Sequence, residues 1–203
     1  MFSAKERIQK WIEKGDKTVT LVLSYLNIEK IPELPANLQY LECNYCPIKE
    51  LPKLPESLKI LSCYSCPNLK ELPELPSSLK ILYCFNSYIK ELPKLPESLQ
   101  VLQCSSCYIE NLPELPESLQ KLNCSRCPIR TLPKLPSSLI SLNCYSCPIK
   151  ELPELPELLQ ILNCYSCDNI KELPKLPPKL ESLQCSYCSI ESLSSILPLK
   201  VYL

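Results

Sequence analysis

Leucine, isoleucine and cysteine recur at fixed spacings along nearly the whole chain, in the pattern LPxLPxxLxxLxCxxCxIxx. The pattern repeats every 20 residues, with one extra residue in two of the copies. The copies begin at Ile31, Leu51, Leu72, Leu92, Leu112, Leu132, Leu152 and Leu173. Residues 18–30 match the second half of the same unit, so the sequence predicts nine stacked turns over residues 18–192.

Each unit contains the alternation typical of a short strand. In LKILSCYSC, Leu61 and Cys63 alternate with Ile60, Ser62 and Tyr64, which places one set of side chains inward. One unit has too few apolar side chains to offset the entropy of ordering its backbone, so the units must stack into a solenoid with a parallel sheet. The two prolines of each LPxLP segment lack an N–H and disfavour helix before them, so we expect an extended or polyproline-like outer side.

A stack of repeats needs a capping element at each end. Ser3 and Glu6 form a capping box, Ile8, Trp11 and Ile12 share one helical face, and a glycine at position 15 can end the helix. We therefore expect a helix over residues 3–14 within an N-terminal cap of residues 1–17. Residues 193–203 are expected to form a partial last turn or cap, or to leave an apolar sheet edge that invites self-association, so we expect a monomer or an edge-mediated homodimer.

The unit resembles a known family. LKILSCYSCPNL, residues 58–69, is similar to the leucine-rich repeat LxxLxLxxNxL, with cysteine at the last strand leucine and at the asparagine. The LPxLP spacer and the short period resemble the effectors that pathogenic bacteria secrete into host cells, and CPNLKELPELPSSLKIL is also similar to repeats of plant intracellular immune receptors. The resemblance implies a β-rich solenoid: a leucine-rich-repeat horseshoe of about nine turns with a concave parallel sheet. It implies a scaffold that binds a protein, and names no ligand.

Composition narrows the function. The 203 residues contain no histidine and one glycine, which excludes Ser-His-Asp and Cys-His sites and glycine-rich phosphate loops, so we expect no enzyme activity and no cofactor. The 22 basic and 22 acidic residues balance, which argues against nucleic acid or an anionic membrane as partner. No signal peptide or membrane span is recognisable, so we expect a cytoplasmic protein, the cytoplasm of a host cell included.

The cysteine pairs allow two interpretations. Cys43, Cys46, Cys63 and Cys66 have the C-x2-C-x16-C-x2-C spacing of a four-thiolate zinc site. The repeat register instead assigns cysteines to inward positions, where buried thiols line a core. Leucine replaces both cysteines in the first turn, and Ser87 replaces one in a later turn, which favours the lining. Zinc binding or a redox response remains the alternative.

The outward strand positions are the candidate binding surface. Four columns that begin at Tyr40, Glu42, Asn44 and Tyr45 hold 32 residues over eight turns. Three of these are charged, whereas the overall composition would give about seven. The columns hold eight of the aromatic residues together with asparagine and serine, a composition typical of protein-recognition surfaces, although strands favour aromatics in any case. The predicted partner-binding residues are Tyr40, Tyr64, Tyr83, Phe85, Asn123, Arg126, Asn143, Tyr145, Asn163 and Tyr165.

The third residue of each unit alternates between glutamate and lysine down the stack. Examples are Glu33, Lys53, Glu74 and Lys94. We expect these side chains to form a solvated outer surface, on which facing opposite charges contribute about 0 to 1 kcal/mol a pair.

Overall fold

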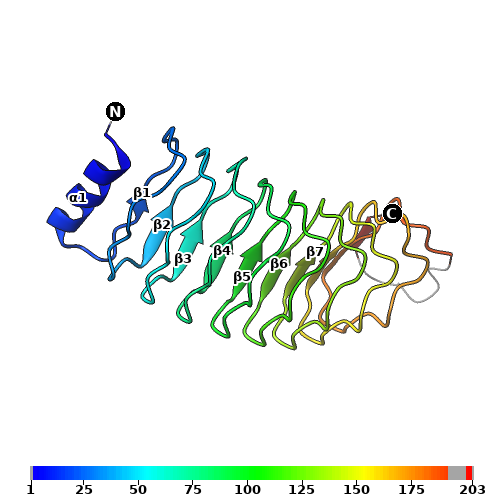
Figure 1. Cartoon of the computed structure of the whole chain (residues 1–203). Helices are drawn as coiled ribbons and strands as arrows, with labels where there is room; N and C mark the ends of the chain where they lie inside the picture. Colours follow the sequence, from blue (N-terminus) through cyan, green and yellow to red (C-terminus); the bar gives the residue numbers. More distant parts are fainter. Residues whose placement is uncertain (1, 192–199, 203) are drawn as a thin grey trace.

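The computed structural model describes residues 2–191 and 200–202. They form a single stack of turns that follows an N-terminal helix (Figure 1). In this part of the chain one helix, α1 (Ala4–Lys14), precedes ten strands. The strands are β1 (Leu21–Val22), β2 (Tyr40–Glu42), β3 (Ile60–Ser62), β4 (Ile81–Tyr83), β5 (Val101–Gln103), β6 (Lys121–Asn123), β7 (Ser141–Asn143), β8 (Ile161–Asn163), β9 (Ser182–Gln184) and β10 (Lys200–Tyr202). They make one parallel sheet in chain order, as the repeat predicts.

The strand register follows the repeat. From β2 to β9 the central leucine of each strand pairs with the central leucine of the next, for example Leu41 with Leu61 and Leu61 with Leu82, and all three are fully buried. The extra residue of each longer turn lies in a loop, where Asn68 Nδ2 donates to the carbonyl of Pro47 at 3.2 Å. The insertion therefore leaves the pairing of the strands unchanged.

The outer side of the solenoid is extended, as the prolines predict. Within the described residues, the LPxLP segments contain no helix and no strand beyond isolated bridges. Each ends in a tight turn, in which for example the amide of Leu58 donates to the carbonyl of Pro55 at 3.0 Å. The leucines of these segments point inward and complete the core, with Leu54 2% exposed.

The helix α1 covers the first strand, which confirms the predicted cap helix. Ser3 and Glu6 make the capping box, and Gly15 ends the helix with a left-handed φ of 68°. Trp11 is buried and donates from Nε1 to the carbonyl of Val19 at 2.7 Å, which attaches the helix to the chain entering β1. Ile12 was expected on the packed face but is 49% exposed, because the helix contacts the solenoid through a narrower stripe that includes Ile8 and Trp11.

The alternating glutamates and lysines form the solvated surface that the sequence predicts, and none of them is in an ion pair among the described residues. The two ion pairs among the described residues join the first full turn to the preceding half-turn at other positions, Lys30 to Glu50 at 2.8 Å and Lys49 to Glu29 at 2.6 Å. The alternating column that begins with Glu33 stays in solvent. All four paired side chains are well exposed, so these contacts add little stability.

The C-terminal strand β10 pairs in parallel with β9, so the sheet continues to Tyr202. The rest of the predicted terminal turn, residues 192–199 and 203, lies outside the described residues. No helix in the described part of the chain is both long and apolar enough to cross a membrane.

Candidate functional site

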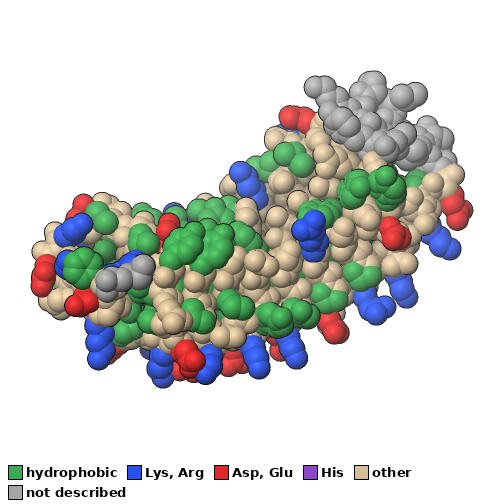
Figure 2. Space-filling view, turned by 90° about the horizontal axis from the view of Figure 1, so that it is seen from above, with side chains coloured by type: hydrophobic (Ala, Val, Ile, Leu, Met, Phe, Trp, Pro, Cys, Tyr) green, Lys and Arg blue, Asp and Glu red, His purple; other side chains and the backbone are tan. Residues whose placement is uncertain are grey.

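Asn44, Ser62 and Ser125 are buried, and the other residues of the four outward columns that begin at Tyr40, Glu42, Asn44 and Tyr45 form a continuous surface, which we call the sheet face. The columns run across the parallel strands because the strand register is in step with the repeat. Figure 2 shows that charged side chains gather along one long margin of the molecule, whereas uncharged and hydrophobic side chains cover much of the surface above it. The structure therefore separates a charged outer side from a largely neutral sheet face.

Four rings at the N-terminal half of the sheet face are in contact, and we call them the aromatic row: Tyr25, Tyr45, Tyr64 and Phe85. The centroids of Tyr25 and Tyr45 lie 4.8 Å apart with the rings nearly parallel. Tyr45 meets Tyr64 edge to face at 5.3 Å. Tyr64 stacks on Phe85 at 4.3 Å with an angle of 7°. The row thus joins four consecutive turns into one rigid aromatic strip.

The other predicted aromatic residues lie in separate places along the sheet face. Arg126 lies over the ring of Tyr145, with 5.1 Å from Cζ to the centroid. Tyr165 meets Tyr187 edge to face at 5.3 Å, further toward the C-terminus. Tyr40 and Tyr83 lie in β2 and β4 and are half-buried.

Three residues in these ring contacts were not among the predicted site residues. They are Tyr25, Tyr45 and Tyr187. The sequence could have indicated Tyr25, because Tyr25 occupies the position in the N-terminal half-unit that Tyr45 occupies in the first full unit.

The predicted asparagines are partly exposed and also accept hydrogen bonds within the chain. The side-chain oxygen of Asn143 accepts from the amide of Tyr145 at 3.3 Å, and that of Asn163 accepts from the amide of Tyr165 at 3.0 Å. Asn123 accepts in the same way from the residue two positions on, at 3.2 Å. These oxygens position the residues that follow the strands, so the amide N–H groups are what the asparagines can offer a partner.

Each turn leaves its strand through a residue in the left-handed region. Nine non-glycine residues have φ between 53° and 62°. They are Tyr25, Tyr45, Ser65, Asn86, Ser106, Arg126, Ser146, Ser166 and Tyr187. The left-handed residue donates its amide to a carbonyl of the next turn, for example Ser106 to Ser125 at 2.8 Å. These bonds continue the hydrogen-bond ladder of the parallel sheet beyond the strands, and the left-handed backbone presents the fourth column to solvent. The left-handed conformation costs about 1 to 2 kcal/mol for each such residue.

The cysteines line the core. All 15 lie within the described residues as free thiols, and only Cys188 is not fully buried. The second cysteine of a turn donates its S–H to the carbonyl of the first cysteine position in the preceding turn. Cys66 Sγ lies 3.2 Å from the Cys43 carbonyl, and Cys127 Sγ lies 3.2 Å from the Cys104 carbonyl. The cysteines thus act as buried donors between turns.

The pKa values of most thiols oppose thiolate chemistry. Burial raises the pKa of Cys63 well above its usual value, that of Cys66 to about 11 and that of Cys127 to about 12. Three thiols differ, because a side-chain hydrogen bond with a cysteine of the preceding turn lowers the pKa of Cys147, of Cys167 and of Cys188, that of Cys188 to about 7. Among residues 2–191 and 200–202, no group of three or more His, Cys, Asp or Glu side chains is arranged to hold a metal ion. The core-lining interpretation is therefore favoured over zinc or redox chemistry.

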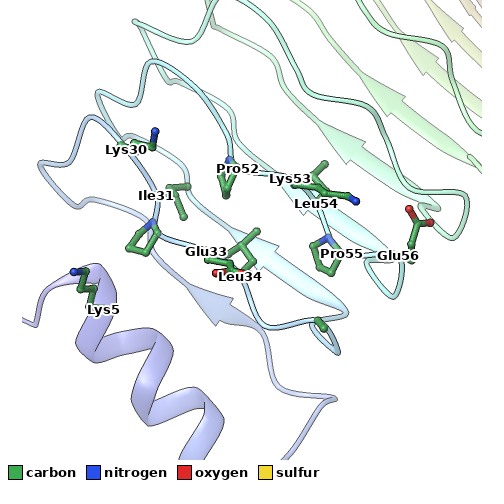
Figure 3. A pocket seen from close by; sticks show the side chains of 12 residues that line it. Lys5, Lys30, Ile31, Glu33, Leu34, Pro52, Lys53, Leu54, Pro55 and Glu56 are labelled. Carbon is green, nitrogen blue, oxygen red and sulfur yellow. The ribbon is translucent and has the colours of Figure 1, made fainter.

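A hollow lies on the outer side, between α1 and the LPxLP segments of the first two turns (Figure 3). Its volume is about 740 Å³, and its walls include Pro32, Leu34, Pro52 and Leu54. Leu34 is 7% exposed and Leu54 is 2% exposed, so these two leucines contribute little to the surface of the hollow. Charges of both signs border it, which gives it no distinct ligand chemistry. The sheet face is the stronger candidate.

No protein-family model and no curated protein sequence matches this chain. Among solved structures, the chain is similar to a Shigella effector LRR domain, with 28% identity and a TM-score of 0.67 over 92% of this chain and 76% of that one. It is similar to YopM from Yersinia enterocolitica, with 30% identity and a TM-score of 0.56 over 89% of this chain, and it spans half of that YopM chain.

The chain also has the fold of the functional domain of InlJ from Listeria monocytogenes, which is described as including a cysteine ladder. That similarity has 24% identity and a TM-score of 0.60, and covers 88% of this chain and 48% of that one.

Proposed function

Since the chain is a leucine-rich-repeat protein whose short repeats resemble those of secreted bacterial effectors, we propose that it is a non-enzymatic scaffold that binds a protein partner on its sheet face. The observation that carries this proposal is the composition of the sheet face: three charged residues in 32, with an aromatic row joined by ring contacts across four turns.

The physical chemistry of tyrosine supports the proposal. A tyrosine held by its neighbours loses little side-chain entropy on binding, and its ring and hydroxyl offer both apolar contact and a hydrogen bond. Tyr64 is held between Tyr45 and Phe85, so its orientation is set before any partner arrives. Central aromatic anchors of this kind commonly contribute most of the binding energy of a protein interface.

The setting of the function follows from the resemblance. Similarity to the Shigella effector domain and to YopM supports a role in which the chain, delivered by a bacterium, holds a protein inside a host cell. The absence of histidine from the sequence supports a binding function over hydrolytic catalysis.

The cysteines fit a structural part in this scaffold. The cysteine ladder recorded for InlJ supports the view that stacked thiols stabilise this kind of solenoid. In the present chain the thiols are buried donors between turns, so they hold the shape of the sheet face and do not themselves meet the partner.

The test is retention of proteins from a host-cell extract on the immobilised chain, followed by mass spectrometry. We expect the wild-type chain to retain a specific protein, and Tyr64→Ala and Tyr145→Ala to lose it. Tyr108→Ala is the matched control, because Tyr108 is 52% exposed but lies outside the four columns.

Circular dichroism establishes that each variant is folded. Equal retention by all three variants would show that the sheet face is not the binding surface. Failure of the wild-type chain to retain any protein would argue against the scaffold function itself.

A further inference from the structure

The three charged residues of the sheet face are unevenly distributed along the solenoid. Glu42 ends β2, Lys121 begins β6, and Arg126 follows β6. No ion pair among the described residues involves any of the three. Lys121 and Arg126 are exposed and Glu42 is half-exposed. The sheet face therefore has one acidic position near its N-terminal end and two basic positions near its middle, all without a charged partner within the chain.

The aromatic row ends between these charges. Phe85 stacks on Tyr64 with one face, and the next two positions of its column are Ser105 and Ser125. The column becomes aromatic again at Tyr145, against which Arg126 lies. The serines have no ring to stack on Phe85, so the aromatic row ends at Phe85, two turns before the turn of Arg126.

The spacing of these features follows from the parallel register. Turns are separated by about 4.8 Å, so Phe85 lies about 10 Å along the solenoid from Glu42 in one direction and about 10 Å from Arg126 in the other. An extended peptide advances about 3.3 Å per residue. Three residues of such a peptide would therefore span each interval.

We propose that the sheet face binds an extended polypeptide segment in which an apolar or aromatic residue has an acidic residue three positions to one side and a basic residue three positions to the other. The apolar residue packs against Phe85, the acidic residue meets Arg126, and the basic residue meets Glu42. This inference rests on the proposed scaffold function and specifies the chemistry of its partner.

The charges also select the orientation of the segment. Reversing the segment along the solenoid places its acidic residue against Glu42 and its basic residue against Arg126, and like charges in contact reject that arrangement. A guanidinium such as that of Arg126 can hold a carboxylate with two hydrogen bonds, which adds geometric selection to charge. Because the surrounding residues are uncharged, these few charges determine the orientation of the segment more strongly than they would on a surface that carries many charges of both signs.

The experiment uses a phage-displayed library of random 12-residue peptides, selected on the whole wild-type chain. We expect the enriched peptides to share the acidic, apolar and basic residues at intervals of three. Their affinities are then measured by biolayer interferometry for the wild type and for the Lys121→Glu/Arg126→Glu variant, with at least a tenfold loss expected in the latter.

The control is Lys90→Glu/Arg130→Glu, which makes the same change in net charge at exposed positions outside the sheet face. We expect its affinities to stay within twofold of the wild type. A selection on the Lys121→Glu/Arg126→Glu variant should replace the acidic position of the enriched peptides by lysine or arginine.

Enriched peptides without an acidic residue at the stated interval would overturn the inference and leave the scaffold function standing. Equal loss of affinity in the two double variants would also overturn it, because bulk charge would then explain the effect. A library that yields no binder to the folded wild-type chain would count against both the inference and the proposed function.

Discussion

Ser78→Ala should destabilise the solenoid although the serine lies on the outer side, where substitutions are usually neutral. Ser78 Oγ lies 2.7 Å from the carbonyl oxygen of Leu58 and 2.6 Å from that of Glu56, both in the preceding turn. Leu58 is fully buried, and its carbonyl makes no other hydrogen bond in the described part of the chain. Alanine would leave this oxygen without a donor, which costs about 1 to 3 kcal/mol.

The control for this prediction is the neighbouring residue. Ser77 is exposed and its hydroxyl makes no hydrogen bond within the described residues, so Ser77→Ala should change the free energy of unfolding by less than about 0.5 kcal/mol. Urea unfolding followed by circular dichroism measures both variants. Because turns contact only their neighbours, the loss at one interface lowers the stability of the stack. Equal unfolding midpoints for the two variants would refute the assigned role of the Ser78 hydroxyl.

Three further predictions follow from the same structure. Leu158 takes the place of Ser78 in a later turn and is 41% exposed, so Leu158→Ser should restore the bridge and raise the unfolding free energy by about 1 kcal/mol, measured by urea unfolding. Ser106→Gly should raise the melting temperature because φ there is 53°, whereas Ser105→Gly should lower it; the opposite order would contradict the strain argument. Since the pKa of Cys188 is lowered to about 7, its alkylation by iodoacetamide should accelerate as pH rises through 7, when the thiolate forms. Peptide mass spectrometry measures the alkylation and should find the buried cysteines unmodified. A midpoint of the pH dependence near 9 would contradict the assigned hydrogen bond.

The serine bridge shows what sequence reasoning missed on the outer side. Serine recurs at one position of five consecutive units, and each hydroxyl lies near a carbonyl of the turn before it. The five residues are Ser57, Ser78, Ser98, Ser118 and Ser138. The recurrence was visible in the sequence, but a pattern of hydrophobic positions does not show which groups the polar side chains contact. Only the stacked backbone shows that an exposed position is close to buried carbonyl groups.

The helix and the aromatic row show the same limit. The sequence correctly predicted the cap helix, because capping and periodicity are local properties. It misplaced Ile12, because the width of the packed stripe depends on how the helix meets β1. It assigned Tyr45 and Tyr64 to different columns, whereas the structure joins their rings across those columns.

By itself, the sequence determined the number of turns, the parallel register, the inward cysteines and the neutrality of the outward columns. A repeat of 20 or 21 residues can bury its leucines in only one register, so periodicity decides which residues share a column. The tertiary structure alone decided which side chains meet: the aromatic row, the serine bridges, the asparagine oxygens held by their own turns and the position of Arg126 over Tyr145. Those contacts depend on side-chain rotamers and on the left-handed residue after each strand, and neither is encoded in the spacing of hydrophobic positions.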